Sequence, residues 1–386
     1  MPDLLRQEIA ATAHTVVIKI GTRPLTRADG LLDEERIGHL AGEIQELIDG
    51  GRHVALVSSG AVGAGMGQLR LIRRPSDLPQ LQAAAAIGQS YLVQAYERAL
   101  RAHGRHAAQI LLTLRDLEDR KGYLNVRNTL LALFEFGAVP IINENDSVSV
   151  EELETTFGDN DRLAAYVTNL LRAPLLVILS DVDGLYDRDP LDPQAAVIPT
   201  VPRLDESVAA LVRDRVTGLS KGGMASKLEA ARIATAAGEN VIIASGRRPG
   251  VLASIFAGEP VGTLFLAQGS LVTARKRWIG YTVKPRGYLV LDVGARRAIE
   301  SRGSSLLPIG VVEAVGTFSK GDVVGLRDPG GEEFARGLTN YAAAEITRIK
   351  GLRTEDVARV LGHCPYHEVI HRDNMVITSA DNGSAR

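Results

Sequence analysis

The feature that most constrains the fold is a regular alternation of short apolar segments with longer segments of helical periodicity, from Thr15 to about residue 265. The apolar segments are rich in β-branched residues and are predicted to form strands at 15–20, 53–59, 106–112, 138–143, 174–180 and 240–245. The periodic segments are predicted to form helices at 33–51, 78–104, 123–137, 161–172 and 222–238. This alternation indicates right-handed βαβ units, and therefore an α/β fold: an αβα sandwich around a mainly parallel sheet. In such sheets ligands bind at the carboxyl ends of the strands.

The pattern changes after the last of these strands. Residues 269–286 are polar, basic and punctuated by glycine, which is typical of a linker. Short β-like segments separated by turns follow, and only 354–362 has a helical pattern. We therefore predict an α/β domain over 1–268, a linker over 269–286, and a small, mostly-β module with a barrel-like fold over 287–378. The tail, 379–386, is predicted to be disordered.

The composition is that of a globular protein with a full core. Of the 386 residues 45% are hydrophobic, the mean hydropathy is +0.03 and the net charge is −2. So small a charge gives no general attraction to nucleic acid or to anionic membranes, and no apolar run is long enough to cross a bilayer. The N-terminal segment lacks the apolar core of a signal peptide, and the single cysteine, Cys364, excludes an intrachain disulfide. These features predict a cytoplasmic protein.

Chemically distinctive groups follow the predicted strands at their carboxyl ends. They are Lys19 and Gly21 at the first strand, Ser58, Ser59 and Gly60 at the second, Asn143, Glu144, Asn145 and Asp146 at the fourth, Ser180, Asp181 and Asp183 at the fifth, and Lys227 at the start of the last helix. Each motif alone has an ordinary structural explanation, such as a tight turn, a helix cap or a lysine that reaches solvent. Together, glycine-rich loops and two lysines with a carboxylate between them fit the neutralisation of charge on a phosphoryl group. Neither glycine motif matches a Walker A or protein-kinase loop, so the residues alone indicate an α/β enzyme that handles a phosphorylated ligand.

Several motifs occur in a distinctive order: VVIKIGT, VSSGAVGAG, AVPIINENDSV, FGDND, SDVDGLY and GLSKGGMASK. In this order and spacing they resemble those of the glutamate 5-kinases, or γ-glutamyl kinases, of the amino acid kinase family. The segments AAAAIGQ, GYLNVRNTL, VGTLF, RKRWI and RGSSLLPIGV agree, and the resemblance extends from Thr15 to Thr378. The C-terminal module resembles the PUA domain that many of these enzymes carry. Related kinases for aspartate, acetylglutamate, carbamate or UMP share the architecture but not this set of motifs.

The resemblance implies a reaction and a set of site residues. ATP, with Mg²⁺, would phosphorylate the γ-carboxylate of L-glutamate to L-glutamyl 5-phosphate, the first step of proline biosynthesis. In this resemblance Lys19 and Lys227 stabilise the transferring phosphoryl group, and Asp161 orients both lysines. Glutamate would be bound by Ser59, Asp146 and Asn160. The implied ATP contacts are Lys19, Gly21, Gly60, Ser180, Asp181, Lys221, Gly222, Gly223, Met224, Ala225, Ser226 and Lys227, and no protein ligand for a metal is implied.

The acid-rich segment 143–161 suits such a substrate. Asp146 would complement the ammonium group of glutamate, and Asn160 could donate to a carboxylate. No general base is required, because the attacking carboxylate is already ionised at neutral pH. Two positions depart from the family pattern: Thr156 stands where Lys or Arg is usual, and Arg23 stands where Ser is common. These departures are expected to affect glutamate binding and inhibition by proline, and to leave the phosphoryl site unchanged.

Three alternatives stay open at this point. RNA binding by the PUA-like module is one, but Lys and Arg nearly balance Asp and Glu over 286–365, whereas nucleic-acid sites usually show a basic excess. Nucleic acid is therefore not expected as the main partner. Another carboxylate or phosphate kinase of the same fold is the second alternative. A catalytically dead homologue is the third, and the presence of Lys19, Lys227 and Asp161 disfavours it. The resemblance also implies a homo-oligomer, a dimer or tetramer, and feedback inhibition by proline, which presents the same ammonium and α-carboxylate as glutamate.

Overall fold

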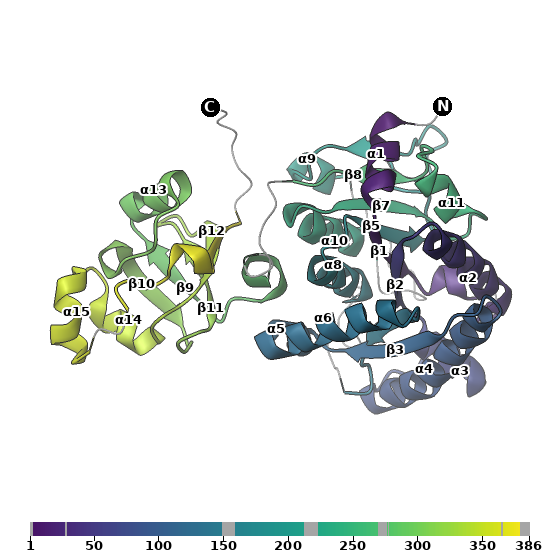
Figure 1. Cartoon of the computed structure of the whole chain (residues 1–386), viewed down its shortest axis with the longest axis horizontal. Helices are drawn as coiled ribbons and strands as arrows, with labels where there is room; N and C mark the ends of the chain where they lie inside the picture. The colour runs from purple at the N-terminus through teal and green to yellow at the C-terminus, as the bar shows by residue number, and fades with distance from the viewer. Residues whose placement is uncertain are drawn as a thin grey trace. The chain divides into compact units, whose positions relative to one another are not determined.

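The computed structural model describes residues 3–27, 29–148, 159–211, 223–268, 276, 278–363 and 366–378. The chain forms two compact units, residues 1–270 and residues 271–386, and Figure 1 labels most of their helices and strands. Each unit has its own hydrophobic core. Within the described ranges, no helix combines the length and the apolar character that a membrane crossing requires.

The first unit is built on a sheet with the strand order β3-β4-β2-β1-β5-β7-β8-β6. Its strands are β1 Thr15–Ile20, β2 His53–Ser58, β3 Ala107–Leu112, β4 Val139–Glu144, β5 Leu175–Ser180, β6 Thr200–Val201, β7 Asn240–Ser245 and β8 Thr263–Phe265. All pairs are parallel except β7 with β8. The central strands β1, β4 and β5 are buried along their whole length, as expected for a sheet covered on both faces. The predicted α/β fold class is confirmed.

Helices cover both faces of this sheet. They are α1 Leu4–Thr12, α2 Glu34–Asp49, α3 Ala61–Gln68, α4 Leu78–Arg101, α5 Leu114–Glu118, α6 Arg120–Glu135, α8 Asp159–Leu171, α9 Glu206–Ala209, α10 Met224–Ala236 and α11 Val251–Phe256, with a short 3₁₀ turn η1 at Arg23–Leu25. Helices α1, α2, α4 and α11 share one core with the sheet. Helices α6, α8 and α10 pack together beside the other face, as Figure 1 shows.

The alternation of side chains along β1 decides which face each residue meets. Ile18 and Ile20 belong to the core shared with α2 and α4. Lys19, between them, therefore points to the opposite face, where α8 and α10 lie. A lysine in an otherwise apolar strand is in this way directed at two helix starts rather than into the hydrophobic core.

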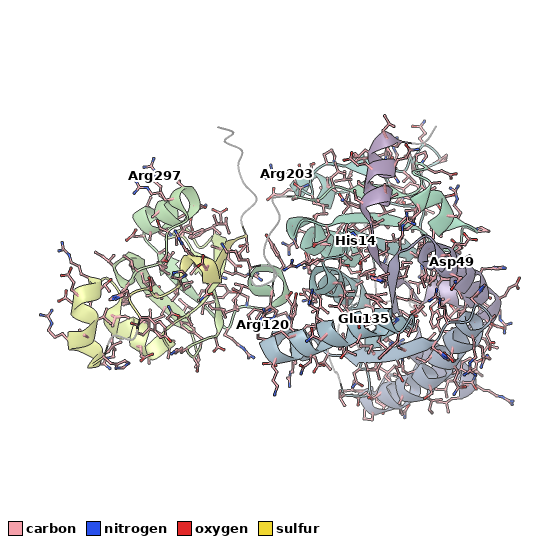
Figure 2. All side chains as sticks on the ribbon, viewed as in Figure 1. His14, Asp49, Arg120, Glu135, Arg203 and Arg297 are labelled. Atoms are coloured by element: carbon pink, nitrogen blue, oxygen red, sulfur yellow. The ribbon has the colours of Figure 1, made fainter. Side chains whose placement is uncertain are left out.

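The order of the strands also sets where a ligand can bind. From β1 the chain moves to β2 on one side, and after β4 it crosses through α8 to β5 on the other side of β1. The junction of β1 and β5 is therefore a topological switch point, the position outside the carboxyl ends of the strands at which sheets of this kind bind ligands. His14 directly precedes β1, and Asp49 and Glu135 end the helices that lead to β2 and β4. These three residues, labelled in Figure 2, therefore lie at the opposite, amino-terminal edge of the sheet.

The second unit contains a five-stranded sheet with the order β10-β9-β11-β12-β13. Its strands are β9 Gly287–Leu291, β10 Val311–Gly316, β11 Val323–Arg327, β12 Glu333–Leu338 and β13 Met375–Ile377. Its helices are α13 Val293–Arg302, α14 Ala343–Ile349 and α15 Thr354–Leu361, with 3₁₀ turns at Pro308–Gly310 and Arg372–Asn374. The mostly-β character predicted for this module is confirmed.

The prediction that only 354–362 is helical in this unit is wrong, because α13 and α14 are helices too. α13 is short of apolar residues, so its periodicity is weak, and its caps define it instead. The Asp292 side chain accepts a hydrogen bond from the Ala295 N–H, and Gly303 ends the helix in the left-handed region at φ +60°. These cap residues are visible in the sequence and could have identified the helix.

The segment predicted as a linker, 269–286, contains an ordered piece. Residues Trp278–Thr282 form a π-helical turn, η2, that contacts β12 and β13 of the second unit. The Arg336 guanidinium holds it by donating to the carbonyl oxygens of Gly280, at 3.0 Å, and Val283, at 3.2 Å. Residues 269–275 and the predicted disordered tail lie outside the described residues.

Candidate active site

A buried cluster of two lysines and one aspartate lies at the carboxyl edge of the first sheet. Lys19 Nζ is 2.6 Å from Asp161 Oδ1, and Lys227 Nζ is 3.5 Å from Asp161 Oδ2. The Asp161 side chain is 0% exposed, and each lysine side chain is 7% exposed. The three residues come from β1, the first turn of α8 and the first turn of α10, so the structure brings together the predicted catalytic residues.

Local backbone and hydroxyl contacts hold the cluster in place. The N–H of Gly21 donates to the Leu179 carbonyl at 3.1 Å, which ties the loop after β1 to β5. On α10, the Ser226 hydroxyl donates to Asp161 Oδ2 at 2.6 Å. Lys227 Nζ also lies 3.4 Å from the carbonyl oxygen of Gly223, the residue that precedes the helix. Asp161 therefore joins three segments that are far apart in the sequence.

The electrostatics of the cluster favour an anion. Burial by itself would raise the pKa of Asp161, but the charges of Lys19 and Lys227 and the hydrogen bonds from Lys19 and Ser226 outweigh it. The pKa of Asp161 is therefore held well below its ordinary value. With Asp161 ionised, two ammonium groups share one carboxylate at the start of two helices. This local excess of positive charge suits a phosphoryl group.

Beside the charged cluster runs a chain of neutral amide side chains. Asn160 Nδ2 donates to Asn143 Oδ1 at 3.0 Å, and Asn143 Nδ2 donates to Gln89 Oε1 at 2.7 Å. The Glu144 N–H also donates to Asn143 Oδ1, at 2.9 Å. The three amides are buried and come from α8, the end of β4 and α4. Asp146, also buried, follows in the turn after β4.

The loop between β2 and α3 approaches the loop after β1. The N–H of Ser59 donates to the carbonyl of Ile20 at 3.1 Å. Gly60 has φ +108°, a conformation that suits glycine, and a Cβ built on it would lie 4.0 Å from the Thr22 methyl group. Ser59 and Gly60 thus lie beside the residues that flank Gly21.

Ser180 ends β5 and Asp181 follows it, and Asp181 forms an ion pair that sequence reasoning missed. Arg23 Nη1 lies 2.5 Å from Asp181 Oδ2, and the Ser180 hydroxyl donates to Asp181 Oδ1 at 3.1 Å. Burial raises the pKa of Asp181, but the hydrogen bond and the charge of Arg23 outweigh it and lower that pKa. Arg23 therefore bridges the switch point between β1 and β5, on the side predicted to hold the nucleotide. It was expected instead to affect glutamate binding.

The remaining predicted positions divide between placed and undescribed residues. Gly223, Met224 and Ala225 lie at the start of α10, immediately before Ser226. Lys221 and Gly222 lie outside the described residues, as does Thr156. The segment 221–227, predicted to contact ATP, is therefore described only from Gly223 onward.

Comparisons with known proteins agree with this architecture. The model of the Amino acid kinase family matches residues 14–245, and that of the PUA domain matches residues 287–361. The chain belongs to the amino acid kinase family. Both predicted family assignments are thereby confirmed. The Lys19–Asp161–Lys227 cluster, the amide chain and every strand of the first sheet except β8 fall within the kinase match.

Curated relatives within the family are similar over nearly the whole chain. "Glutamate 5-kinase" of Rhodopirellula baltica is 50% identical over 97% of this chain and 96% of its own length. "Glutamate 5-kinase" of Moorella thermoacetica is 45% identical over 95% of this chain and 96% of its own length. "Glutamate 5-kinase" of Methylococcus capsulatus is 46% identical over 95% and 98%, respectively. The similarity therefore includes both units.

Two residues at this amino acid kinase site were not singled out from the sequence. Arg23 was noticed only as a departure from a family pattern, and Gln89 only as part of the segment AAAAIGQ. For Gln89 a signal existed, since it is a polar residue on the otherwise apolar face of a long helix. No local signal pairs Arg23 with Asp181, which lies 158 residues further along the chain.

Proposed function

We propose that the chain is a glutamate 5-kinase, which transfers the γ-phosphoryl group of ATP to the γ-carboxylate of L-glutamate. The observation that carries the proposal is the buried Asp161 between Lys19 and Lys227. Two ammonium groups on either side of one carboxylate can neutralise the negative charge of a phosphoryl group during its transfer. The names of relatives that are 45–50% identical over nearly the full length support the substrate.

The phosphoryl half of the reaction is assigned to the charged cluster. Lys19 and Lys227 stabilise charge on the equatorial oxygens of the transferring group, and Asp161 orients both lysines. ATP is held by Gly21 and Gly60, by Ser180 and Asp181 at the end of β5, and by the loop that ends in α10. Residues Lys221, Gly222, Gly223, Met224, Ala225, Ser226 and Lys227 make up that loop.

The acceptor half is assigned to the segments after β2 and β4. Asp146 pairs with the ammonium group of glutamate, and Ser59 and Asn160 donate to its carboxylates. One oxygen of the ionised γ-carboxylate forms a bond to the γ-phosphorus while the bond from that phosphorus to the bridging oxygen breaks, and ADP leaves. No proton moves in this step, so the site needs no general base.

We propose that Mg²⁺ binds together with the nucleotide rather than in a site made of protein ligands. Among the described residues, no group of three or more His, Cys, Asp and Glu side chains could hold a metal ion. Asp161 and Asp181 are both engaged by cations of the chain. An ion bound to the ATP phosphates would offset their charge.

Further properties follow from the same proposal. The product is the activated acid that begins proline biosynthesis from glutamate. Proline presents the same ammonium and α-carboxylate as glutamate, so it is proposed as a feedback inhibitor at or overlapping the glutamate site. A homo-oligomer, dimer or tetramer, and a cytoplasmic location complete the proposal.

The test is the formation of the acyl phosphate, trapped with hydroxylamine, by purified protein with Mg-ATP. L-Glutamate, L-aspartate and N-acetylglutamate are compared, and ADP release is measured in parallel. We expect hydroxamate with glutamate only, and its loss in Lys227→Ala but not in Lys121→Ala, a control at an exposed lysine of α6. Turnover with another acid alone would keep the kinase and overturn the substrate, and no turnover with any acid would overturn the kinase.

A further inference from the structure

Gln89 is a buried amide with one half of its hydrogen-bonding capacity used. It lies on α4 and is 7% exposed. Its Oε1 accepts from Asn143 Nδ2 at 2.7 Å, but its Nε2 is buried and has no hydrogen-bond partner among the described residues. Buried donors are almost always paired, because leaving one without an acceptor costs free energy. We therefore expect the Nε2 group of Gln89 to donate to an acceptor that the described residues do not supply.

The packing of α4 holds Gln89 at the carboxyl edge of the sheet. A Cβ on the preceding residue, Gly88, would lie 1.8 Å from the Ala61 carbonyl oxygen and 2.2 Å from the Gly65 nitrogen. Only glycine permits this approach of α4 to α3, the helix that begins directly after Ser59 and Gly60. The backbone at Gln89 is thus fixed between the loop after β2 and the end of β4, which are the segments assigned to the acceptor substrate.

The direction of the amide chain points to the chemistry of the missing acceptor. Each amide donates to the next, from Asn160 through Asn143 to Gln89. The Oε1 of Gln89 is therefore occupied, and the group left over is an N–H donor. A neutral N–H donor can bind an anionic oxygen of the substrate. Because it carries no positive charge, it does not compete with Lys19 and Lys227 for that oxygen.

We infer that Gln89 binds the acceptor substrate, its Nε2 donating to a carboxylate oxygen of the amino acid while its Oε1 fixes the orientation of Asn143 and, through it, of Asn160. The inference rests on the proposed function and extends its substrate site to α4. A carboxylate held by Gln89 and Asn160 together is kept from rotating away from the phosphoryl group.

Two substitutions separate the two ends of the Gln89 amide. Gln89→Glu keeps an acceptor for Asn143 Nδ2, removes the donor and adds a negative charge that repels a carboxylate. Gln89→Met removes both ends at similar volume. We expect both to raise KM for glutamate, by about 10- to 100-fold for a lost hydrogen bond to a charged group, and to leave KM for ATP near its wild-type value. Gln94→Glu, at an exposed position of the same helix, adds the same charge and should change neither.

Equilibrium titration with L-glutamate and the melting temperature are measured on the same variants. Normal glutamate affinity in Gln89→Glu would overturn the inference, since the donor would then be dispensable. An effect in Gln89→Met alone would reduce Gln89 to a residue that orients Asn143, and would also overturn it. Equal losses for both substrates with a lowered melting temperature would indicate a packing role only. A wild-type protein that neither binds glutamate nor forms hydroxamate would instead defeat the proposed function.

Discussion

Asn160 and Asp161 are consecutive residues of α8, yet they belong to two differently built halves of the site. Asp161 joins Lys19 and Lys227 in a cluster of three buried charges. Asn160 joins Asn143 and Gln89 in a chain of three buried neutral amides. One helix start therefore supplies a charged side and an uncharged side of the same site.

The two halves depend on different physical quantities. A buried charge is tolerable only while its partner is present, so the charged half responds to any change in charge. An amide has a fixed donor end and a fixed acceptor end, so the neutral half responds to a change in direction even when no charge changes. The charged half should control turnover, and the amide half should control affinity for the acceptor.

The largest effect is expected from Lys19→Met, which removes a charge from the buried strand but keeps a side chain of similar length. Because stabilisation by Lys19 grows as charge develops on the phosphoryl oxygens, kcat should fall by about 10²–10³-fold, the usual cost of one such donor. KM for glutamate should change little. Initial rates of ADP release over both substrates check this, and a rise in KM with normal kcat would break the division between the halves.

Asp161→Asn should lower the stability of the protein as well as its activity. It leaves two buried ammonium groups without a carboxylate, and breaking a buried ion pair costs about 3–5 kcal/mol in the free energy of unfolding. Urea unfolding of wild type and variant measures the difference. Lys121→Ala serves again as the control for a lost surface charge.

The pH dependence of that difference tests the cause. The pKa of Asp161 is lower in the folded state than in the unfolded state, so its contribution is fully present above the ordinary carboxyl pKa of about 3.9. It is lost only as the pH falls below that value toward the folded pKa. The difference between wild type and Asp161→Asn should therefore stay level from pH 8 to pH 5. A decline within that range would show that another group is responsible.

Asn143→Asp breaks the amide chain without removing the acceptor that Asn160 and the Glu144 N–H use. It takes away the donor to Gln89 Oε1 and places a negative charge near the acceptor substrate. KM for glutamate should rise about tenfold, the value of one lost hydrogen bond, with kcat less affected. Asn145→Asp, in the turn after β4, is the comparison for added charge nearby. Equal effects of both would mean that charge alone, and not direction, governs this half.

The sequence predicted the charged half better than the neutral half, and the reason is physical. Lys19, Asp161 and Lys227 lie in glycine-rich or acidic motifs whose residue types are unusual at strand and helix ends, and the family resemblance connects them. Gln89 gives only a weak signal, as a single polar residue on the apolar face of a long helix. Its position in the site depends on the contact of Gly88 with α3, a tertiary approach that no local pattern reports.

The elements of the fold also divide into those with a strong local sequence signal and those with a weak one. The strand predicted at 15–20 is β1 to the residue, because a continuous β-branched segment between turn residues is a strong local signal. In the second unit the helix α13 was missed, because its apolar periodicity is weak and its identity rests on the caps Asp292 and Gly303. The antiparallel β8 was missed as well, since three residues carry too little pattern.

A smaller effect is expected from Arg23→Ser. The ion pair with Asp181 crosses the switch point, but its side chains are 30% and 27% exposed, so solvent weakens it relative to the buried cluster. A partly exposed pair contributes about 0.5–1 kcal/mol, and KM for ATP should rise about two- to fivefold with KM for glutamate unchanged. Arg27→Ser, which removes a more exposed pair with Asp29, is the matched control. A change confined to glutamate would move Arg23 to the acceptor half.

The smallest effect on turnover is expected when the second unit is removed, because both halves of the site are built from the first unit. We propose that the kinase domain, 1–268, keeps its own core without the PUA domain.

The position at which the chain is truncated matters, since Trp278 and Ile279 are buried in the turn that contacts β12 and β13. A chain ending at 286 would retain these two apolar side chains without their cover, whereas one ending at 268 would not. We therefore expect wild-type turnover from the shorter chain and aggregation from the longer one, measured by hydroxamate formation and gel filtration. If both chains were insoluble, the proposed independence of the kinase domain would be wrong. If both were soluble but inactive, the second unit would contribute to the site, and the comparison of two halves within one unit would be incomplete.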